Sequence, residues 1–132
     1  MILVDTSVWI DFFRRVDQSW KGELIGLMES ERVGIVAPVV AELLYGAKGD
    51  KERSRVLDLA HSVTVFLTGL DQWIGAGKLG RSMQHKGLTL SIIDCLVATM
   101  AHEKDTPLWT LDADFDPLFD DGTIKRYQPK NP

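Results

Sequence analysis

Acidic side chains recur where short apolar stretches of this sequence end. Asp5 follows the first apolar stretch, and Asp112 and Asp114 follow the last one. Glu42 lies about one helical turn after the second stretch, and Asp94 lies near the start of an apolar, helix-like run. Because ligands of open α/β sheets bind beyond the carboxyl ends of the strands, we expect these acids to share one pocket.

Such a pocket requires cations. Carboxylates a few ångströms apart repel and raise each other's pKa values, whereas a bound divalent ion favours their ionised forms. Mg²⁺ prefers oxygen ligands, and Mn²⁺ accepts the same set. One ion can lower the pKa of a water to make a nucleophile, and a second can stabilise the leaving oxygen. The pattern predicts phosphodiester hydrolysis with Mg²⁺ or Mn²⁺, and leaves open whether one or two ions take part.

Each acid also has a purely structural explanation. Asp5 could cap a helix, Glu42 could be a solvated helix residue, and Asp94 could complete a capping box with Ser91. The two acids after the last apolar stretch could lie in an acidic turn. No single acid decides between these explanations. The coincidence of all of them with strand ends favours the shared pocket.

The acids are positioned by apolar stretches that alternate with helical patterns. We expect strands around Leu3 and at Val33–Val36, Val63–Leu67 and Leu108–Thr110. Helices are expected between them, at 8–13, 24–28, 39–45 after Pro38, 51–60, 71–85 and 91–103. Because parallel strands need crossover helices, this order predicts a three-layer α/β/α sandwich with a central, mostly parallel sheet.

Length and composition set the remaining limits. A chain of 132 residues predicts one domain, residues 1–132, with a loose tail at 128–132. The net charge of −4 argues against a general nucleic-acid coat protein, but not against a nuclease whose carboxylates bind metal. The single cysteine, Cys95, is expected to be buried in a reducing, cytoplasmic setting. No signal peptide or membrane-spanning stretch is expected.

Four blocks of the sequence resemble those of VapC-type PIN-domain toxins of type II toxin–antitoxin systems. They occur in the family's order, span nearly the whole chain and are residues 2–11 (ILVDTSVWID), 38–46 (PVVAELLYG), 93–98 (IDCLVA) and 110–115 (TLDADF). The order of the four blocks makes the resemblance far more specific than any one motif.

The resemblance implies a metal-dependent endoribonuclease that cuts RNA, a VapB-type antitoxin protein that inhibits it, and a homodimeric toxin. By motif position it implies an acidic site of Asp5, Glu42, Asp94 and Asp112, in which Asp5 and Asp94 are the foremost metal ligands. Asp114 is an alternative or additional fourth acid. Thr6 and Thr110 would orient the carboxylates or water through their hydroxyl groups.

Rival functions fit the residues less well. Gly75–Gly80 spells G-x-G-x-x-G, but no strand precedes it directly, so close helix packing or a loosened helix explains it better than a dinucleotide site. A phosphatase with an Asp5 nucleophile lacks a second aspartate, because Ser7 stands there. The three histidines have no zinc-ligand spacing. The main alternative is a non-catalytic metal-binding or protein-interaction module of the same fold.

Aromatic and basic residues suggest contacts outside the acidic pocket. Trp9 and Trp109 are expected in the core, whereas the early helices with Phe12, Phe13 and Trp20 are expected to form an apolar interface. Candidate contacts to the RNA backbone are Arg14, Arg15, Arg81 and Lys86. The sequence does not indicate which RNA is cut.

Overall fold

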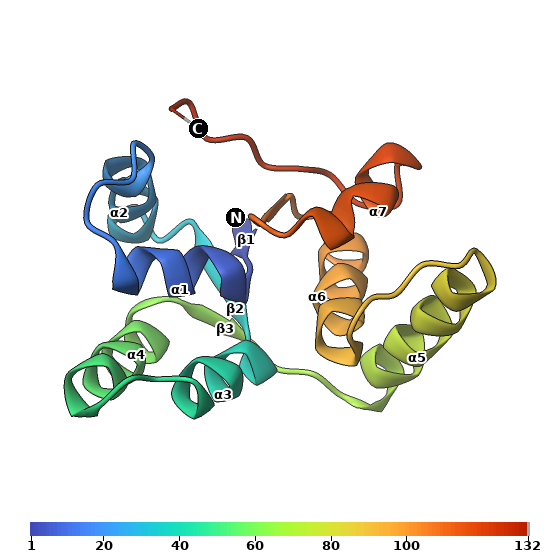
Figure 1. The fold of residues 1–132 in the computed structure, drawn as a ribbon, viewed down its shortest axis with the longest axis horizontal. Helices are drawn as coiled ribbons and strands as arrows, with labels where there is room; N and C mark the ends of the chain where they lie inside the picture. Colours follow the sequence, from blue (N-terminus) through green and yellow to red (C-terminus); the bar gives the residue numbers. More distant parts are fainter. Residues whose placement is uncertain (132) are drawn as a thin grey trace.

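A four-stranded parallel sheet lies at the centre of the computed structural model, which describes residues 1–131 (Figure 1). Its strands are β1 (Ile2–Val4), β2 (Val33–Val36), β3 (Thr64–Phe66) and β4 (Leu108–Trp109). They are ordered β3-β2-β1-β4, and every neighbouring pair is parallel. The carboxyl end of β1 therefore lies between those of β2 and β4, which brings the segments after these strands together.

Helices cover both faces of the sheet and give the predicted three layers. Helices α1 to α4 lie on one side in Figure 1, and α5 to α7 lie on the other. Their bounds are α1 Thr6–Arg14, α2 Lys21–Glu29, α3 Ala37–Tyr45, α4 Asp50–Ser62, α5 Leu70–His85, α6 Ile92–Glu103, the 3₁₀ turn η1 Ala113–Phe115 and α7 Asp116–Asp120. This arrangement confirms the predicted α/β/α sandwich.

Apolar side chains of the strands and of α6 form the centre of the core. Trp9 and Trp109 are buried, as predicted, and so is Cys95 on α6. Burial of each large apolar side chain contributes roughly 1.5–3 kcal/mol. The predicted apolar interface on the early helices is wrong in its main residues, because Phe12 and Trp20 are themselves buried in the core.

The glycines of α5 allow this helix to approach α6 closely. A Cβ atom at Gly75 would lie 2.9 Å from Cγ2 of Thr99, and one at Gly80 would lie 3.3 Å from Sγ of Cys95. The helix continues unbroken through both positions. The G-x-G-x-x-G sequence therefore serves helix packing, in the middle of a helix where no phosphate-binding loop can form.

The C-terminal part departs most from the predictions. The expected acidic turn contains η1 and α7, and the expected loose tail is attached to α2. The hydroxyl of Tyr127 donates to Glu23, and the amide of Lys130 donates to Oε2 of Glu23 over 2.8 Å. Pro132, the last residue of that tail, lies outside the described residues. No helix within residues 1–131 is long and apolar enough to span a membrane.

Candidate active site

Asp5 stands at the carboxyl end of β1 and is almost completely buried, with 2% of its surface exposed. Its amide donates a hydrogen bond of 2.9 Å to the carbonyl of Trp109, so the sheet itself holds the backbone. Asp5 occupies the N-cap position of α1, but its carboxylate accepts no capping hydrogen bond. Helix capping therefore does not explain this buried charge.

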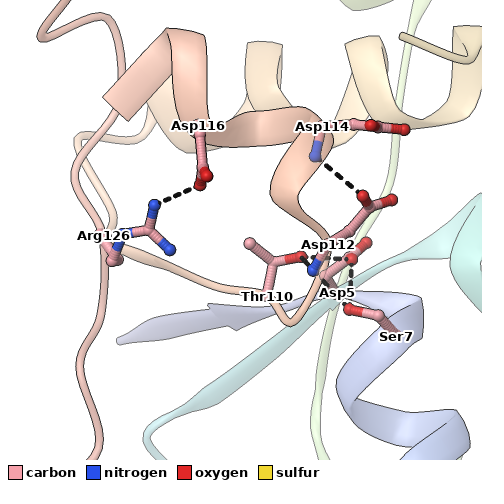
Figure 2. A network of polar contacts seen from close by, with 7 residues as sticks. All are labelled: Asp5, Ser7, Thr110, Asp112, Asp114, Asp116 and Arg126. Carbon is pink, nitrogen blue, oxygen red and sulfur yellow. Dashed lines mark hydrogen bonds and ion pairs between the residues drawn. The ribbon is translucent and has the colours of Figure 1, made fainter. Parts of the chain in front are cut away.

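Two hydroxyl groups bind one oxygen of the Asp5 carboxylate. Ser7 Oγ and Thr110 Oγ1 each donate to Oδ2 over 2.8 Å (Figure 2). Both hydroxyls also accept backbone hydrogen bonds of 3.0 Å, Ser7 from the amide of Leu111 and Thr110 from the amide of Asp112. The network joins the end of β1 to the segment that follows β4.

The other oxygen, Oδ1 of Asp5, is buried and accepts no hydrogen bond from any residue in the described part of the chain. Burial raises the pKa of Asp5, and the hydrogen bonds from Thr110 and Ser7 oppose this rise only in part. A buried, unpartnered carboxylate oxygen is costly unless it is protonated or meets a cation.

Asp94 lies in the first turn of α6, one turn after the cap residue predicted for it. Ser91 is the N-cap, and its Oγ accepts the Asp94 amide over 3.1 Å. Burial raises the pKa of Asp94 to about 6, and the negative charge of Asp5 is the next cause, with smaller effects from Asp112 and Glu42. These acids are therefore close enough to act on Asp94 electrostatically.

Glu42 and Asp112 reach the same end of the sheet from α3 and from the segment after β4. Glu42 is exposed, and its Oε1 accepts a hydrogen bond of 3.0 Å from Thr6 at the start of α1. Asp112 Oδ1 accepts the amide of Asp114 over 2.9 Å and so caps η1. In Figure 2 the Asp112 side chain lies between Asp5 and the exposed Asp114.

No lysine or arginine of residues 1–131 forms an ion pair with any of the candidate site acids, which are Asp5, Glu42, Asp94, Asp112 and Asp114. Nearby Asp116 differs, because it forms an ion pair of 2.5 Å with Arg126 (Figure 2). Two of the proposed RNA-binding arginines also have acidic partners, Arg14 with Glu52 and Arg15 with Asp11. The acids after the strands therefore form a negative region that the chain's own cations do not neutralise.

The donor set suits a hydrated magnesium ion better than a fully caged metal. Within residues 1–131 no three acidic, histidine or cysteine side chains are close enough to hold an ion together. Mg²⁺ usually takes one or two protein carboxylates and keeps several waters. Oδ1 of Asp5, which has no hydrogen-bond partner among residues 1–131, and the carboxylate of Asp94 would fit such a pair of ligands.

An open cavity of about 570 Å³ adjoins this acidic region. Its walls come from the loop between α5 and α6, the start of α6 and the η1–α7 segment, and include Thr89, Ser91, Asp94 and Asp114. Asp94 thus faces both the other acids and an open space in which a substrate can lie. Asp114 borders this cavity, whereas Asp112 is linked through Thr110 to Asp5.

Ser7 is the residue of this region whose contacts the sequence did not reveal. It drew notice only because it stands where a phosphatase would have its second aspartate. Its partner Leu111 is 104 residues away, so no local pattern predicts the contact. The position of a hydroxyl residue two places after a strand-end acid was the one available signal.

Comparison with known families matches the description "PIN domain" over residues 2–118. This chain belongs to the PIN-domain family. Two relatives share 30% identity with it over 120 residues, which are 88% of this chain and 90% of each relative. They are named VapC ribonuclease Mb1587, from Mycobacterium bovis, and Ribonuclease VapC11, from Mycobacterium tuberculosis. The resemblance predicted from the four sequence blocks is thereby confirmed.

Solved structures agree with the PIN-domain fold. VapBC2 from Rickettsia felis, bound to a DNA fragment from its promoter, superposes with a TM-score of 0.76 at 21% identity, over 96% of this chain and 98% of that one. VapC20 from Mycobacterium tuberculosis, described as a toxin that cleaves the sarcin–ricin loop, gives 0.72 at 21% identity, over 98% and 100%. At these identities the likeness supports the PIN fold alone.

Proposed function

We propose that this PIN-domain protein is a metal-dependent endoribonuclease that acts as the toxin of a toxin–antitoxin pair. Relatives at 30% identity are named as ribonucleases over nearly the same length. The observation that carries the proposal is the buried Asp5, which acts electrostatically on Asp94. Among residues 1–131, Oδ1 of Asp5 has no hydrogen-bond partner and no lysine or arginine forms an ion pair with either acid. A divalent ion would supply the missing positive charge and could also bind an RNA phosphate.

In this proposal Asp5 and Asp94 bind Mg²⁺ or Mn²⁺, and Glu42 and Asp112 hold water around it. A bound divalent ion would supply activation of water and neutralisation of the phosphate charge. Thr6 fixes Oε1 of Glu42, which leaves the second oxygen of Glu42 to accept a proton from the attacking water. Asp114, at the edge of the cavity, is an additional ligand for water or the ion.

The partners in this proposal are RNA, a VapB-type antitoxin and a second copy of the chain, in the cytoplasm. Support for the antitoxin comes from the similar folds solved as VapBC complexes, including one from Salmonella typhimurium bound to DNA. Exposed apolar side chains, among them Tyr45, Leu67 and Leu70, offer contact area for protein partners. RNA contacts at Arg81 and Lys86 remain a prediction.

An assay on the purified chain, freed of any antitoxin, tests the activity. RNA should be cut with Mg²⁺ or Mn²⁺, and cutting should stop with EDTA or with the Asp94→Asn substitution. Ser30→Ala is a suitable control, because this exposed hydroxyl binds only the carbonyl of Gly26 within its own helix in the described structure. Mapping the cut ends after induced expression in cells would then identify the RNA and the cleavage site.

The same assay separates the enzyme from the non-catalytic alternative. If RNA survives under every metal condition while a basic partner protein still binds, the chain is an interaction module of this fold. If RNA is cut equally well with EDTA, a metal-independent ribonuclease would replace the proposal. Equal activity of Asp94→Asn and the parent would remove Asp94 from the site.

A further inference from the structure

We propose that Ser7 is a positioning residue that, together with Thr110, turns the Asp5 carboxylate so that only Oδ1 faces the divalent ion. This inference rests on the metal-dependent function proposed above and deepens it. Ser7 and Thr110 both donate to the same oxygen, Oδ2, while Oδ1 is buried without a partner in the described residues. The two oxygens of one carboxylate are thus chemically distinct.

The donors and acceptors of the network favour one arrangement. Each hydroxyl has one proton, and both protons point at Oδ2 of Asp5. The lone pairs of Ser7 and Thr110 accept the amides of Leu111 and Asp112, which can only donate. In this arrangement the Ser7 and Thr110 oxygens lie 3.2 Å apart without a hydrogen bond between them. Turning either proton to the other hydroxyl would exchange a hydrogen bond to the carboxylate for a weaker one to a neutral oxygen.

This arrangement fixes a torsion that is otherwise loose. The last torsion of an aspartate side chain is broad and roughly two-fold, so a free carboxylate presents either oxygen. Two charge-assisted hydrogen bonds of 2.8 Å to one oxygen hold the carboxylate in a single plane. A metal ligand held in advance loses less freedom on binding, so the metal affinity rises.

Ser7 also couples two acids that come from opposite ends of the sequence. Its hydroxyl links the Asp5 side chain to the amide of Leu111, and Thr110 links Asp5 to the amide of Asp112. The backbone that carries Asp112 is therefore held relative to Asp5 by side chains, in addition to the β1–β4 pairing. Removal of either hydroxyl should affect both the metal and the placement of Asp112.

A merely local role for Ser7 does not account for these contacts. Ser7 lies in the first turn of α1, where a serine usually satisfies backbone groups of its own helix. Here its partners are the Asp5 carboxylate and a backbone amide from the segment after β4. Loss of a local contact would lower stability only, whereas loss of a positioning contact would also lower metal affinity.

Mn²⁺ binding to the purified full chain, measured by titration calorimetry, tests the inference without reference to activity. Thr110→Val keeps the shape and removes the hydroxyl, whereas Thr110→Ser keeps the hydroxyl. Ser7→Ala and Ser7→Thr form the corresponding pair, and Ser30→Ala controls for loss of a remote hydroxyl. We expect Ser7→Ala and Thr110→Val to weaken Mn²⁺ binding about tenfold, and Thr110→Ser to stay within about threefold of the parent.

The kinetics of RNA cleavage give the second readout. The kcat for RNA should fall in Ser7→Ala with little change in KM, because in this proposal Ser7 acts through the Asp5 carboxylate and the Leu111 amide. If Ser7→Ala fails to fold, the comparison of Thr110→Val with Thr110→Ser decides. Equal Mn²⁺ affinity in that pair, unchanged affinity in Ser7→Ala, or no Mn²⁺ binding by the parent would overturn the inference. Affinities in the expected order in a parent that cuts no RNA would instead refute the ribonuclease proposal and leave Ser7 in its role.

Discussion

Acids at the ends of the strands and acids at the periphery have opposite environments in this protein. At the periphery, Asp105 binds Lys125 over 2.8 Å, Asp116 binds Arg126, and Asp121 accepts both the hydroxyl and the amide of Thr123. The hydrogen bond from Lys125 lowers the pKa of Asp105, and that from Thr123 lowers the pKa of Asp121. Burial raises the pKa values of Asp5 and Asp94 instead.

This difference in partners and pKa shifts indicates which carboxylates are available to bind a ligand. The peripheral acids already have donors or cations, so their charge has a partner within the chain. Burial raises the pKa of Asp5, and burial together with the negative charge of Asp5 raises the pKa of Asp94. Strongly perturbed acids that border a cavity are candidates for a functional site. Asp94 borders such a cavity from the first turn of α6, and Asp5 acts on it from the carboxyl end of β1.

The largest expected effect follows from neutralising the site acids Asp5 and Asp94, with the peripheral Asp116 for comparison. Asp5→Asn and Asp94→Asn should each lower the rate of RNA cleavage by at least about 100-fold, because loss of a metal ligand exceeds the effect of losing its hydrogen-bond partners. Asp116→Asn should change the rate less than about twofold, since the charge of Asp116 is already paired with Arg126. Initial rates on a labelled RNA in excess Mg²⁺ measure all three.

Substitution of Asp112 and of Asp114 tests which of them is the fourth acid of the site. Asp112→Asn should reduce activity more than Asp114→Asn, because Asp112 is tied through Thr110 to Asp5 and acts on Asp94 electrostatically. The reverse order would make Asp114 the fourth site acid. A loss in Asp116→Asn as large as that in Asp94→Asn would show that the pairing with Arg126 does not separate the two groups.

The dependence of stability on pH follows from the raised pKa of Asp94. Its folded-state pKa of about 6 lies above the ordinary 3.8, so the folded protein favours the protonated acid. The corresponding stability is full below the ordinary pKa and is lost as pH rises through about 6. Without metal, the melting temperature should therefore fall between pH 5 and pH 7.5 by a few degrees, on the order expected for a partly exposed group.

Metal and a neutral variant isolate this effect from that of other titrating groups. Mg²⁺ should raise the melting temperature more at pH 7.5 than at pH 5, because protons compete for the same oxygens. Asp94→Asn should flatten both the fall with pH and the response to Mg²⁺. A melting curve of the metal-free parent that is independent of pH, or that rises toward pH 7.5, would contradict the buried, repelled state of Asp94.

Local patterns predicted the acids and their elements better than they predicted the contacts among them. The strand at Val33–Val36 follows from a short stretch of sequence and is confirmed. Of the capping box considered for Asp94, the structure has one half, in which Ser91 Oγ accepts the Asp94 amide. The order of the strands depends on packing of the whole chain. Ser7 meets Leu111 only because β1 lies beside β4, so the hydroxyl network had no local signature.

The same limit explains the errors near the C-terminus. The tail is polar and lacks a helical or strand pattern, so it was expected to be loose. Its attachment depends on Glu23, about 100 residues earlier, which accepts from both Tyr127 and Lys130. Phe12 and Trp20 were placed on an interface for a related reason, because amphipathic helices do not reveal whether the core or a partner covers them.

The smallest expected effect concerns the peripheral pair itself. Asp116→Asn should lower the free energy of unfolding by about 0.2–1 kcal/mol, as for other partly exposed ion pairs. Arg126→Ala should cost more, because the guanidinium of Arg126 also lies 4.0 Å from the centre of the Phe119 ring and covers it. Urea unfolding of both single variants and the double variant gives the coupling between the two residues.

A coupling below about 1 kcal/mol is expected from that cycle, and it should shrink in high salt because both side chains reach solvent. Such a result would mean that the ion pair neutralises the Asp116 carboxylate but contributes little to the stability of the fold. A coupling of several kcal/mol would mean that Arg126 anchors α7, and hence η1, beside the acidic region. In that case the peripheral acids would position the strand-end acids, and the two groups would no longer be independent.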